Sequence, residues 1–300
     1  MRGTSSETRY ELTPGAWLGR ATVVVVAVFF VAFFALPIIW LLISAGKSPN
    51  ALVTTGPFVP GSVSDLAANW SALVEFQDGI MFRWLRNSAY YSLAALAITL
   101  VTTIPAGYAL ALGEFRGRQV LMTTTLVVML IPNTALVLPI FLELSTADLI
   151  GKPLAAILPF SFYPFGVYLT YIYFSTSVPR ELLAAARIDG CGEVGVFLRI
   201  ALPLAKPVIA LVGFFSFVAN WNNFFLPFLT VPGAAAPVQV GLTELLSNVP
   251  AFNPTAAGVT PIQLPVLALA ALLAVTPVLL VFLFSQRFLV AGLTAGGTKE

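Results

Sequence analysis

The sequence predicts an all-α, polytopic membrane protein with about six transmembrane helices. Of the 300 residues, 58% are hydrophobic and only 9% are charged, and the mean hydropathy is +0.93. Soluble domains have roughly a quarter of their residues charged, so a soluble globular fold is excluded. A membrane-spanning helix needs about 20 apolar residues. Suitable runs occur at about 20–44, 86–112, 119–143, 154–176, 204–230 and 263–286.

The distribution of basic residues indicates the orientation of these spans. If the N-terminus is cytoplasmic, eleven of the 15 Lys and Arg residues lie on the cytoplasmic side and four lie outside. Cytoplasmic loops of membrane proteins carry this excess of positive charge. We therefore expect both termini inside the cell. The expected organisation is a cytoplasmic tail at 1–19, a transmembrane domain at 20–290 and a second cytoplasmic tail at 291–300.

The composition also limits the chemistry of the chain. There is no histidine and a single cysteine, Cys191, which excludes an internal disulfide and histidine-based zinc or acid–base sites. The expected spans are almost free of ionisable side chains, and no Gly-x-x-x-x-Gly-Lys-Ser/Thr loop is present to bind a nucleotide. We therefore predict no catalytic residue, no metal ligand and no enzyme. A transporter of this kind would need an energy-supplying partner.

A polar segment at about 179–203 interrupts the apolar sequence. Its first part runs from Pro179 to Gly190 and contains three consecutive alanines. Proline suits a first helical turn and glycine suits a helix end, so a helix of about ten residues is expected. A second amphipathic stretch at 193–200 leads to Pro203. The segment is predicted to be a helix–turn–helix that docks a soluble partner; the alternative is an ordinary cytoplasmic connection.

This segment resembles the EAA loop of the inner-membrane permease subunits of ATP-binding-cassette importers. In that family the loop is a coupling helix that sits in a cleft of the ATPase subunit. The family's glutamate falls on Ala184 in this sequence, and Glu181, one helical turn earlier, is a candidate to replace it. The resemblance implies an ATPase-coupling surface composed of Glu181, Ala185, Ala186, Arg187, Asp189, Gly190, Leu202 and Pro203.

Amides and a tryptophan within the apolar runs are candidates for a solute path. Asn220, Trp221 and Asn222 lie in the fifth expected span, and Asn133 lies in the third. Uncompensated amides are costly in hydrocarbon, so these side chains should face other helices or water. One interpretation is a hydroxylated solute bound by the amides, with Trp221 stacked on a sugar ring. The other is a clamp of amides between helices.

Further segments are similar to carbohydrate permeases of the same class. They are Ala106–Leu110, the Trp221–Asn222 pair and the C-terminal stretch Gln286–Lys299, which resembles the maltose-type permease subunit. The resemblance implies a multi-pass protein of the bacterial inner membrane that imports a sugar-like substrate. It also implies a second permease subunit, two ATPase subunits that use ATP and Mg, and an extracytoplasmic solute-binding protein. The chain is expected to contact membrane lipid. It is expected to bind no cofactor and no nucleic acid.

Other classes of function remain open at this point. An energy-independent facilitator or channel for a small polar solute would need no ATPase. An importer permease of the same class could carry a solute other than a sugar. An intramembrane enzyme would need paired aspartates or a Ser–Lys pair, and the expected spans offer neither.

Overall fold

The computed structural model describes residues 14–254 and 262–294, and this part of the chain is helical without strands. Its α-helices are α1 (Pro14–Ala45), α2 (Pro49–Thr54), α3 (Val63–Glu75), α4 (Ile80–Leu112), α5 (Arg118–Met129), α6 (Val137–Thr146), α7 (Pro153–Ile157), α8 (Pro164–Thr176), α9 (Arg180–Ile188), α10 (Glu193–Val196), α11 (Leu202–Leu204), α12 (Lys206–Trp221), α13 (Phe225–Thr230), α14 (Val238–Ser247) and α15 (Leu264–Thr294). Shorter segments are the 3-10 helices η1 (Phe76–Asp78), η2 (Asn133–Leu136) and η4 (Gly233–Ala235) and the π-helix η3 (Phe197–Ala201).

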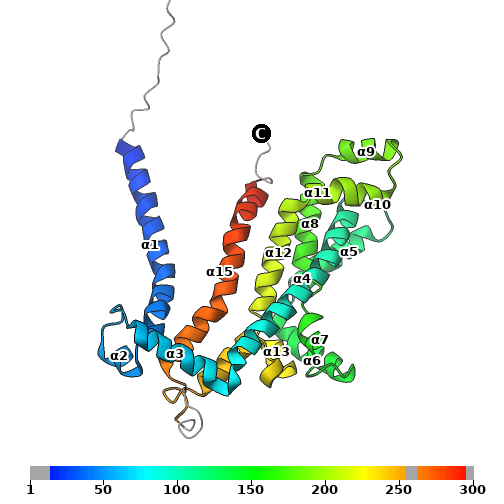
Figure 1. The fold of residues 1–300 in the computed structure, drawn as a ribbon. Helices are drawn as coiled ribbons and strands as arrows, with labels where there is room; N and C mark the ends of the chain where they lie inside the picture. Colours follow the sequence, from blue (N-terminus) through cyan, green and yellow to red (C-terminus); the bar gives the residue numbers. More distant parts are fainter. Residues whose placement is uncertain (1–13, 255–261, 295–300) are drawn as a thin grey trace, which may run out of the picture.

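Long helices packed side by side form the body of the molecule (Figure 1). α4 packs against α8 and α12, α12 also packs against α15, and α5 packs against α8. Three described stretches are long and apolar enough to cross a membrane, namely Gly19–Ala45 in α1, Ile80–Leu112 in α4 and Leu264–Phe288 in α15. The predicted fold class, an all-α polytopic membrane protein, is confirmed.

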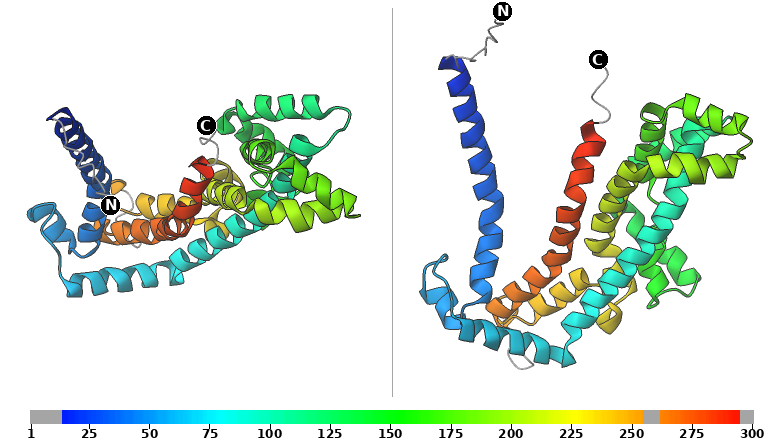
Figure 2. Two further views of the ribbon diagram at one scale, coloured as in Figure 1. Left: turned by 90° about the horizontal axis from the view of Figure 1, so that it is seen from above. Right: turned by 45° about the horizontal axis from the view of Figure 1, so that its top comes forward.

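The two ends of this bundle carry different elements. At one end, called the α9 end, lie α9, α10, η3 and α11, which together form the polar hairpin (residues 179–204). At the other end, called the α3 end, lie α2, α3, α6 and α7 (Figure 1). The first residues of α1 and the last residues of α15 point towards the α9 end in both side views (Figures 1 and 2).

In two of the predicted spans, prolines divide the helix. The span predicted at 119–143 stops as α5 at Met129, and the chain then bends by 97° into η2 and α6. Pro132 precedes η2 and lacks the N–H that a continuing helix would need. The span predicted at 154–176 is divided into α7 and α8, and Pro164 begins α8, where proline is tolerated.

The span predicted at 204–230 is also interrupted. α12 begins at Lys206 after a bend of 76° from the segment Glu193–Leu204, and it ends at Trp221 before the short α13. If each bent pair counts as one span, the described residues contain up to 5 spans by length and composition. The 13-residue α8 is too short for that test. The interruptions leave non-helical backbone within the bundle.

Helix α1 stands apart from the other long helices over most of its length (Figures 1 and 2). It contacts α15, but in its most apolar stretch 0% of the residues are buried. It begins at Pro14, inside the tail predicted at 1–19, and α15 continues to Thr294, past the boundary predicted at 290. Residues 1–13 and 295–300, which hold most of both predicted tails, lie outside the described residues.

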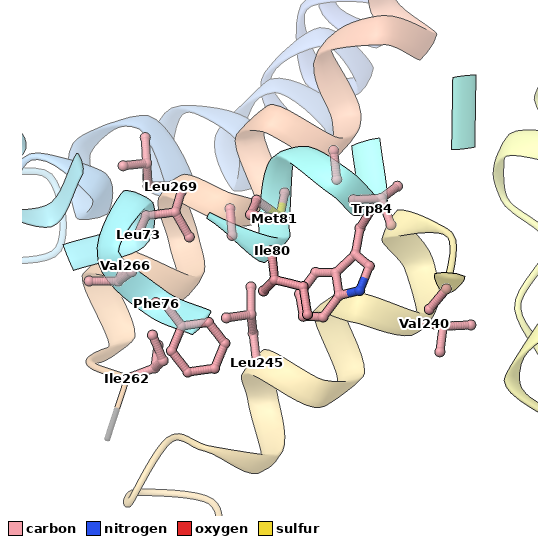
Figure 3. Packing of buried hydrophobic residues seen from close by; sticks show 14 of the residues in the cluster. Leu73, Phe76, Ile80, Met81, Trp84, Val240, Leu245, Ile262, Val266 and Leu269 are labelled. Carbon is pink, nitrogen blue, oxygen red and sulfur yellow. The ribbon is translucent and has the colours of Figure 1, made fainter. Parts of the chain in front are cut away.

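A hydrophobic cluster at the α3 end joins distant parts of the chain (Figure 3). Leu73 of α3 and Trp84 of α4 pack there with side chains from the C-terminal half. Leu245 of α14 and Leu269 of α15 contribute from that half. Trp84 is fully buried, and its Nε1 donates a hydrogen bond to the carbonyl of Gly233 at 3.0 Å. This cluster fixes the start of α4 to the start of α15.

Candidate functional site

The first helix of the polar hairpin is closed at its C-terminal end by a Schellman motif. Pro179 is the residue just before α9, one position earlier than the first-turn position predicted. At the other end, the N–H of Gly190 donates to the carbonyl of Arg187 at 3.0 Å. The N–H of Cys191 donates to the carbonyl of Ala186 at 2.9 Å. Gly190 has a φ of 86°, which favours glycine, so the helix end is satisfied by its own residues.

An ion pair joins the two arms of the hairpin. Arg187 of α9 donates from Nε to Oε1 of Glu193 at 2.6 Å and from Nη2 to Oε2 at 3.1 Å. This two-pronged geometry restricts the angle between α9 and α10. The hydrogen bond from Arg187 lowers the pKa of the Glu193 carboxyl below its usual value and raises the pKa of Arg187.

Apolar contacts attach the inner face of the hairpin to the bundle. Leu183 of α9 is only 2% exposed and belongs to one cluster with Phe174 of α8 and Val196 of α10. Tyr108 of α4 contacts both Phe174 and Phe197, with ring centroids 5.2 and 4.9 Å away. The hairpin therefore forms one packed unit with the neighbouring ends of α4 and α8.

A hydrogen bond also ties the exit of the hairpin to α8. The hydroxyl of Tyr173 donates to the carbonyl of Leu204 at 2.7 Å. Leu204 is the last residue of α11, and the 76° bend into α12 follows directly. The last carbonyls of a helix have no donor within that helix and need another one. Tyr173 supplies a donor at this bend.

The outward surface of the hairpin mixes exposed apolar and charged side chains. Ile188 is 86% exposed and Leu182 is 47% exposed, and both lie on the same helix as the exposed residues Glu181 and Asp189. Glu181 is in the first turn of α9, where the helix dipole favours a carboxylate. Apolar side chains of this size, exposed beside charges, are typical of a surface that contacts another protein.

The residues predicted for ATPase coupling all lie on this hairpin. Two of them, Ala186 and Leu202, are partly buried. The other six are exposed, namely Glu181, Ala185, Arg187, Asp189, Gly190 and Pro203. Ala184, which occupies the position of the family's glutamate, is exposed as well. The outward surface is thus formed by small side chains next to charged ones.

The structure places Trp221 inside the bundle. It is 2% exposed, its Nε1 donates to the carbonyl of Ala274 in α15 at 3.0 Å, and its ring stacks on Phe217 with centroids 5.6 Å apart. The side chain therefore holds α12 against α15, and its faces are covered. The structure thus gives no support to the interpretation in which a sugar stacks on this ring.

The predicted amides lie in different surroundings. Asn220 donates to the carbonyl of Ser216 at 2.8 Å, within its own helix. Asn222 is exposed and accepts a hydrogen bond from Gln239 at 3.4 Å. Asn133 is exposed at the start of η2 and lines a cavity. The amide of Asn222 thus bonds across to α14, as the clamp interpretation expects, whereas Asn220 bonds only within its own helix.

The cavity beside α5 was not predicted from the sequence. It has a volume of about 460 Å³ and lies between the end of α5, η2, the segment before α8, and α12. Four aromatic residues line it together with Asn133, namely Phe160, Phe162, Tyr163 and Phe165. The sequence signal that could have indicated the cavity is the run of aromatic residues between Pro159 and Pro164. The prediction of one continuous helix over 154–176 obscured it.

The chain belongs to the family described as binding-protein-dependent transport system inner membrane component, because residues 103–295 match the sequence model of that family. It is therefore a permease component of an ATP-binding-cassette importer and not an enzyme. Membership of this family implies partnership with ATPase and solute-binding components. Among the described residues, no group of three or more His, Cys, Asp or Glu side chains could hold a metal ion.

Relatives cover most of the chain. The arabinooligosaccharides transport system permease protein AraQ of Halalkalibacterium halodurans is 30% identical over 272 residues, which is 90% of this chain and 93% of the relative. The trehalose transport system permease protein SugB of Mycobacterium tuberculosis is 28% identical, covering 90% and 94%. The maltodextrin transport system permease protein MdxG of Bacillus subtilis is 32% identical, covering 75% and 78%.

A solved structure has the same fold. It is a chain in the crystal structure of a bacterial ABC transporter involved in the import of the acidic polysaccharide alginate. The TM-score is 0.76 at 21% sequence identity, and the match covers 96% of this chain and 99% of that chain. The separated α1, the interrupted helices and the polar hairpin thus belong to a fold that is found in an importer.

Proposed function

We propose that this chain is one of two permease subunits in a bacterial importer that moves a sugar or a sugar oligomer into the cell. Two ATPase subunits use ATP and Mg, and one of them would dock on the polar hairpin of each permease subunit. The observation that carries the proposal is the hairpin itself. Its outward surface exposes Ile188 and Leu182 beside charges, while Leu183 fixes its inner face to α4 and α8.

The named substrates of the relatives support a sugar as the solute. The relatives are named for the transport of arabinooligosaccharides, trehalose and maltodextrin. These relatives differ in the sugar that they carry, so the substrate class is inferred and not one particular sugar. The spans contribute few ionisable groups, which suits a neutral, hydroxylated solute better than a charged one.

The exposed surfaces of α1 and α5 support a second permease subunit. No residue of α5 is buried, and the most apolar stretch of α1 is 0% buried. Exposed apolar surface of this extent marks contact with lipid or with another membrane protein. Gln119, Thr123 and Thr124 are exposed on α5, and polar side chains are better placed against protein than against lipid. We infer that the partner permease covers α5.

The arrangement of the ends supports cytoplasmic termini. The start of α1, the end of α15 and the polar hairpin lie towards the same end of the bundle (Figure 1). The excess of basic residues favours that end as the cytoplasmic one. The solute-binding protein would then deliver the sugar at the α3 end.

Co-purification from the native membrane, followed by reconstitution, tests the proposal. The complex is expected to contain a second permease and an ATPase. In liposomes with the binding protein, it should import at least one of arabinotriose, trehalose or maltotriose, only when ATP is present inside. Flux of these sugars through the chain alone, without ATP, would support a facilitator instead. ATP-driven uptake of a polyol but of no sugar would contradict the substrate class.

A further inference from the structure

The cavity beside α5 lies where the chain departs from helical structure twice. One departure is the 97° bend between α5 and α6, where Asn133 is located, and the other is the stretch 158–163 between α7 and α8. Non-helical backbone at membrane depth is tolerated where protein buries it or where it lines a water-filled cavity. Interrupted helices around a central space also build the solute sites of secondary transporters. The backbone therefore indicates a solvated space at this position.

The aromatic walls of the cavity are held in position before any ligand arrives. Phe165 makes edge contacts with Tyr163 and with Phe215 of α12, with ring centroids 5.9 Å apart in each case. Phe160 packs on the hydrophobic cluster that contains Leu226 of α13. Phe162, by contrast, is 67% exposed. Rings that are already fixed lose little conformational entropy when they bind a ligand.

Two polar groups at the cavity have no hydrogen-bond partner among the described residues. They are the amide of Asn133 and the hydroxyl of Tyr163. Polar groups left unpaired in an apolar medium cost free energy, so water or a ligand must take up their hydrogen bonds. A lipid tail in this space would leave both groups unpaired. A ligand that combines hydroxyl groups with apolar ring faces would satisfy both the polar groups and the aromatic walls.

We propose that this cavity is a sugar-binding subsite on the translocation path, in which the positioned rings of Tyr163 and Phe165 contact the ring faces of the sugar and Asn133 hydrogen-bonds its hydroxyl groups. The cavity volume of about 460 Å³ lies within the range of small-molecule sites. The subsite rests on the proposed function, because it assumes that the importer carries a sugar. The aromatic rings of this cavity take the role that was predicted for Trp221, whose ring faces are covered, as the surface on which a sugar could stack.

Protection from alkylation tests the subsite directly. Phe162→Cys in the co-purified importer, held in nanodiscs, is treated with N-ethylmaleimide, and peptide mass spectrometry measures the labelling rate. Arabinotriose, trehalose and maltotriose are added in separate reactions. The sugar that the wild-type importer transports should slow labelling by about threefold or more once it occupies most of the sites. Phe225→Cys, which is exposed on α13 outside the cavity, should be labelled at the same rate with and without sugar.

Each of the other outcomes overturns either the subsite or the proposed function on which the subsite rests. Equal labelling of Phe162→Cys with and without the transported sugar would show that the sugar does not enter the cavity. No labelling in either condition would show that the partner permease fills it. If liposomes that contain the wild-type importer import none of the three sugars, the proposed function itself is wrong. If they import one and position 162 is not protected, only the subsite fails.

Discussion

The turn of the polar hairpin and the segment between α7 and α8 both interrupt a helix, but different parts of the chain stabilise them. Gly190 and Cys191 close the turn with hydrogen bonds back into α9. The segment before α8 also makes hydrogen bonds within itself, but other helices support it as well. Thr99 of α4 donates to the carbonyl of Ser161 at 2.8 Å, and Ser216 of α12 donates to the hydroxyl of Thr99 at 3.2 Å.

This difference indicates how the two regions can respond to a force. The hairpin can move as a unit, because its internal hydrogen bonds do not depend on the rest of the bundle. The segment before α8 keeps the hydrogen bond from Thr99 only while α4 and α12 hold their positions relative to it. Since the hairpin packs on the ends of α4 and α8, its displacement would alter the support of the cavity. We expect coupling between ATPase and solute to follow this route.

Gly190→Pro should produce the largest effect, because it destroys the local closure of the hairpin. Proline cannot adopt a φ of 86° and lacks the N–H that donates to Arg187. The expected local cost is about 3 kcal/mol or more. Uptake of sugar per ATP hydrolysed in proteoliposomes should fall close to background, while the amount of inserted chain stays the same.

Gly192→Pro is the matched control for this change. Gly192 has a φ of -68°, which proline adopts, and no atom lies within 4 Å of the place where its Cβ would be. Uptake by this variant should remain near that of the wild type. Normal transport by Gly190→Pro would mean that the closed turn has no part in coupling.

Gly107→Ala tests how closely the bundle depends on packing between α4 and α8. A Cβ at this position would lie 2.4 Å from the Cβ of Thr170. Overpacking of this kind costs about 1–3 kcal/mol, so the melting temperature of the purified protein should fall. At Gly213, also in a helix, the nearest atom would be 3.8 Å away. Gly213→Ala should therefore leave the melting temperature unchanged or raise it, and equal losses in both variants would refute the close approach.

Thr99→Val tests the support that other helices give to the segment before α8. The variant keeps the side-chain shape but leaves the buried carbonyl of Ser161 without its donor. We expect a cost of about 1–2 kcal/mol, measured as a fall in melting temperature. The hydroxyl of Thr102 bonds only within α4, to Ile98 and Thr99, so Thr102→Val should cost less. The reverse order would mean that the segment does not depend on α4.

The smallest effect is expected from the ion pair in the hairpin. The pKa of Glu193 is lowered in the folded state, so the pair stabilises the hairpin above the ordinary pKa of a glutamate, about 4.3. This stabilisation is lost as the pH falls through the lowered pKa. After correction for the intrinsic pH dependence of exchange, the protection of the amides in α9 should therefore be lower at acid pH than at neutral pH. Arg187→Gln should remove this pH dependence, and an unchanged dependence in the variant would exclude the pair as its cause.

Local sequence signals were sufficient to predict the hairpin but not the interrupted helices. Pro179 and Gly190 act on their own neighbours, so the ends of α9 could be predicted to within a residue. The runs at 119–143 and 154–176 were predicted as continuous spans although they contain Pro132 and Pro164. Whether a helix continues past a proline depends on which other helices satisfy the freed backbone groups, and the local sequence does not contain that information.

The site residues show the same difference between features set by the local sequence and features set by contacts with distant helices. Trp221 was a reasonable candidate for stacking on a sugar, yet its partner Ala274 lies in α15, far along the chain. The cavity is assembled from α5, η2, the segment before α8 and α12. Only the three-dimensional packing brings these parts together, so the sequence could indicate aromatic residues but not the space that they enclose.

Photo-crosslinking from Ile188 tests the central claim most directly. This side chain is 86% exposed on the outward surface of the hairpin, and a benzoylphenylalanine in its place would react with whatever covers it. Irradiation of native membranes should give a single major product that contains the ATPase subunit. A product that contains the solute-binding protein would place the hairpin outside the cell and contradict the docking role. Products with lipid alone would contradict it equally.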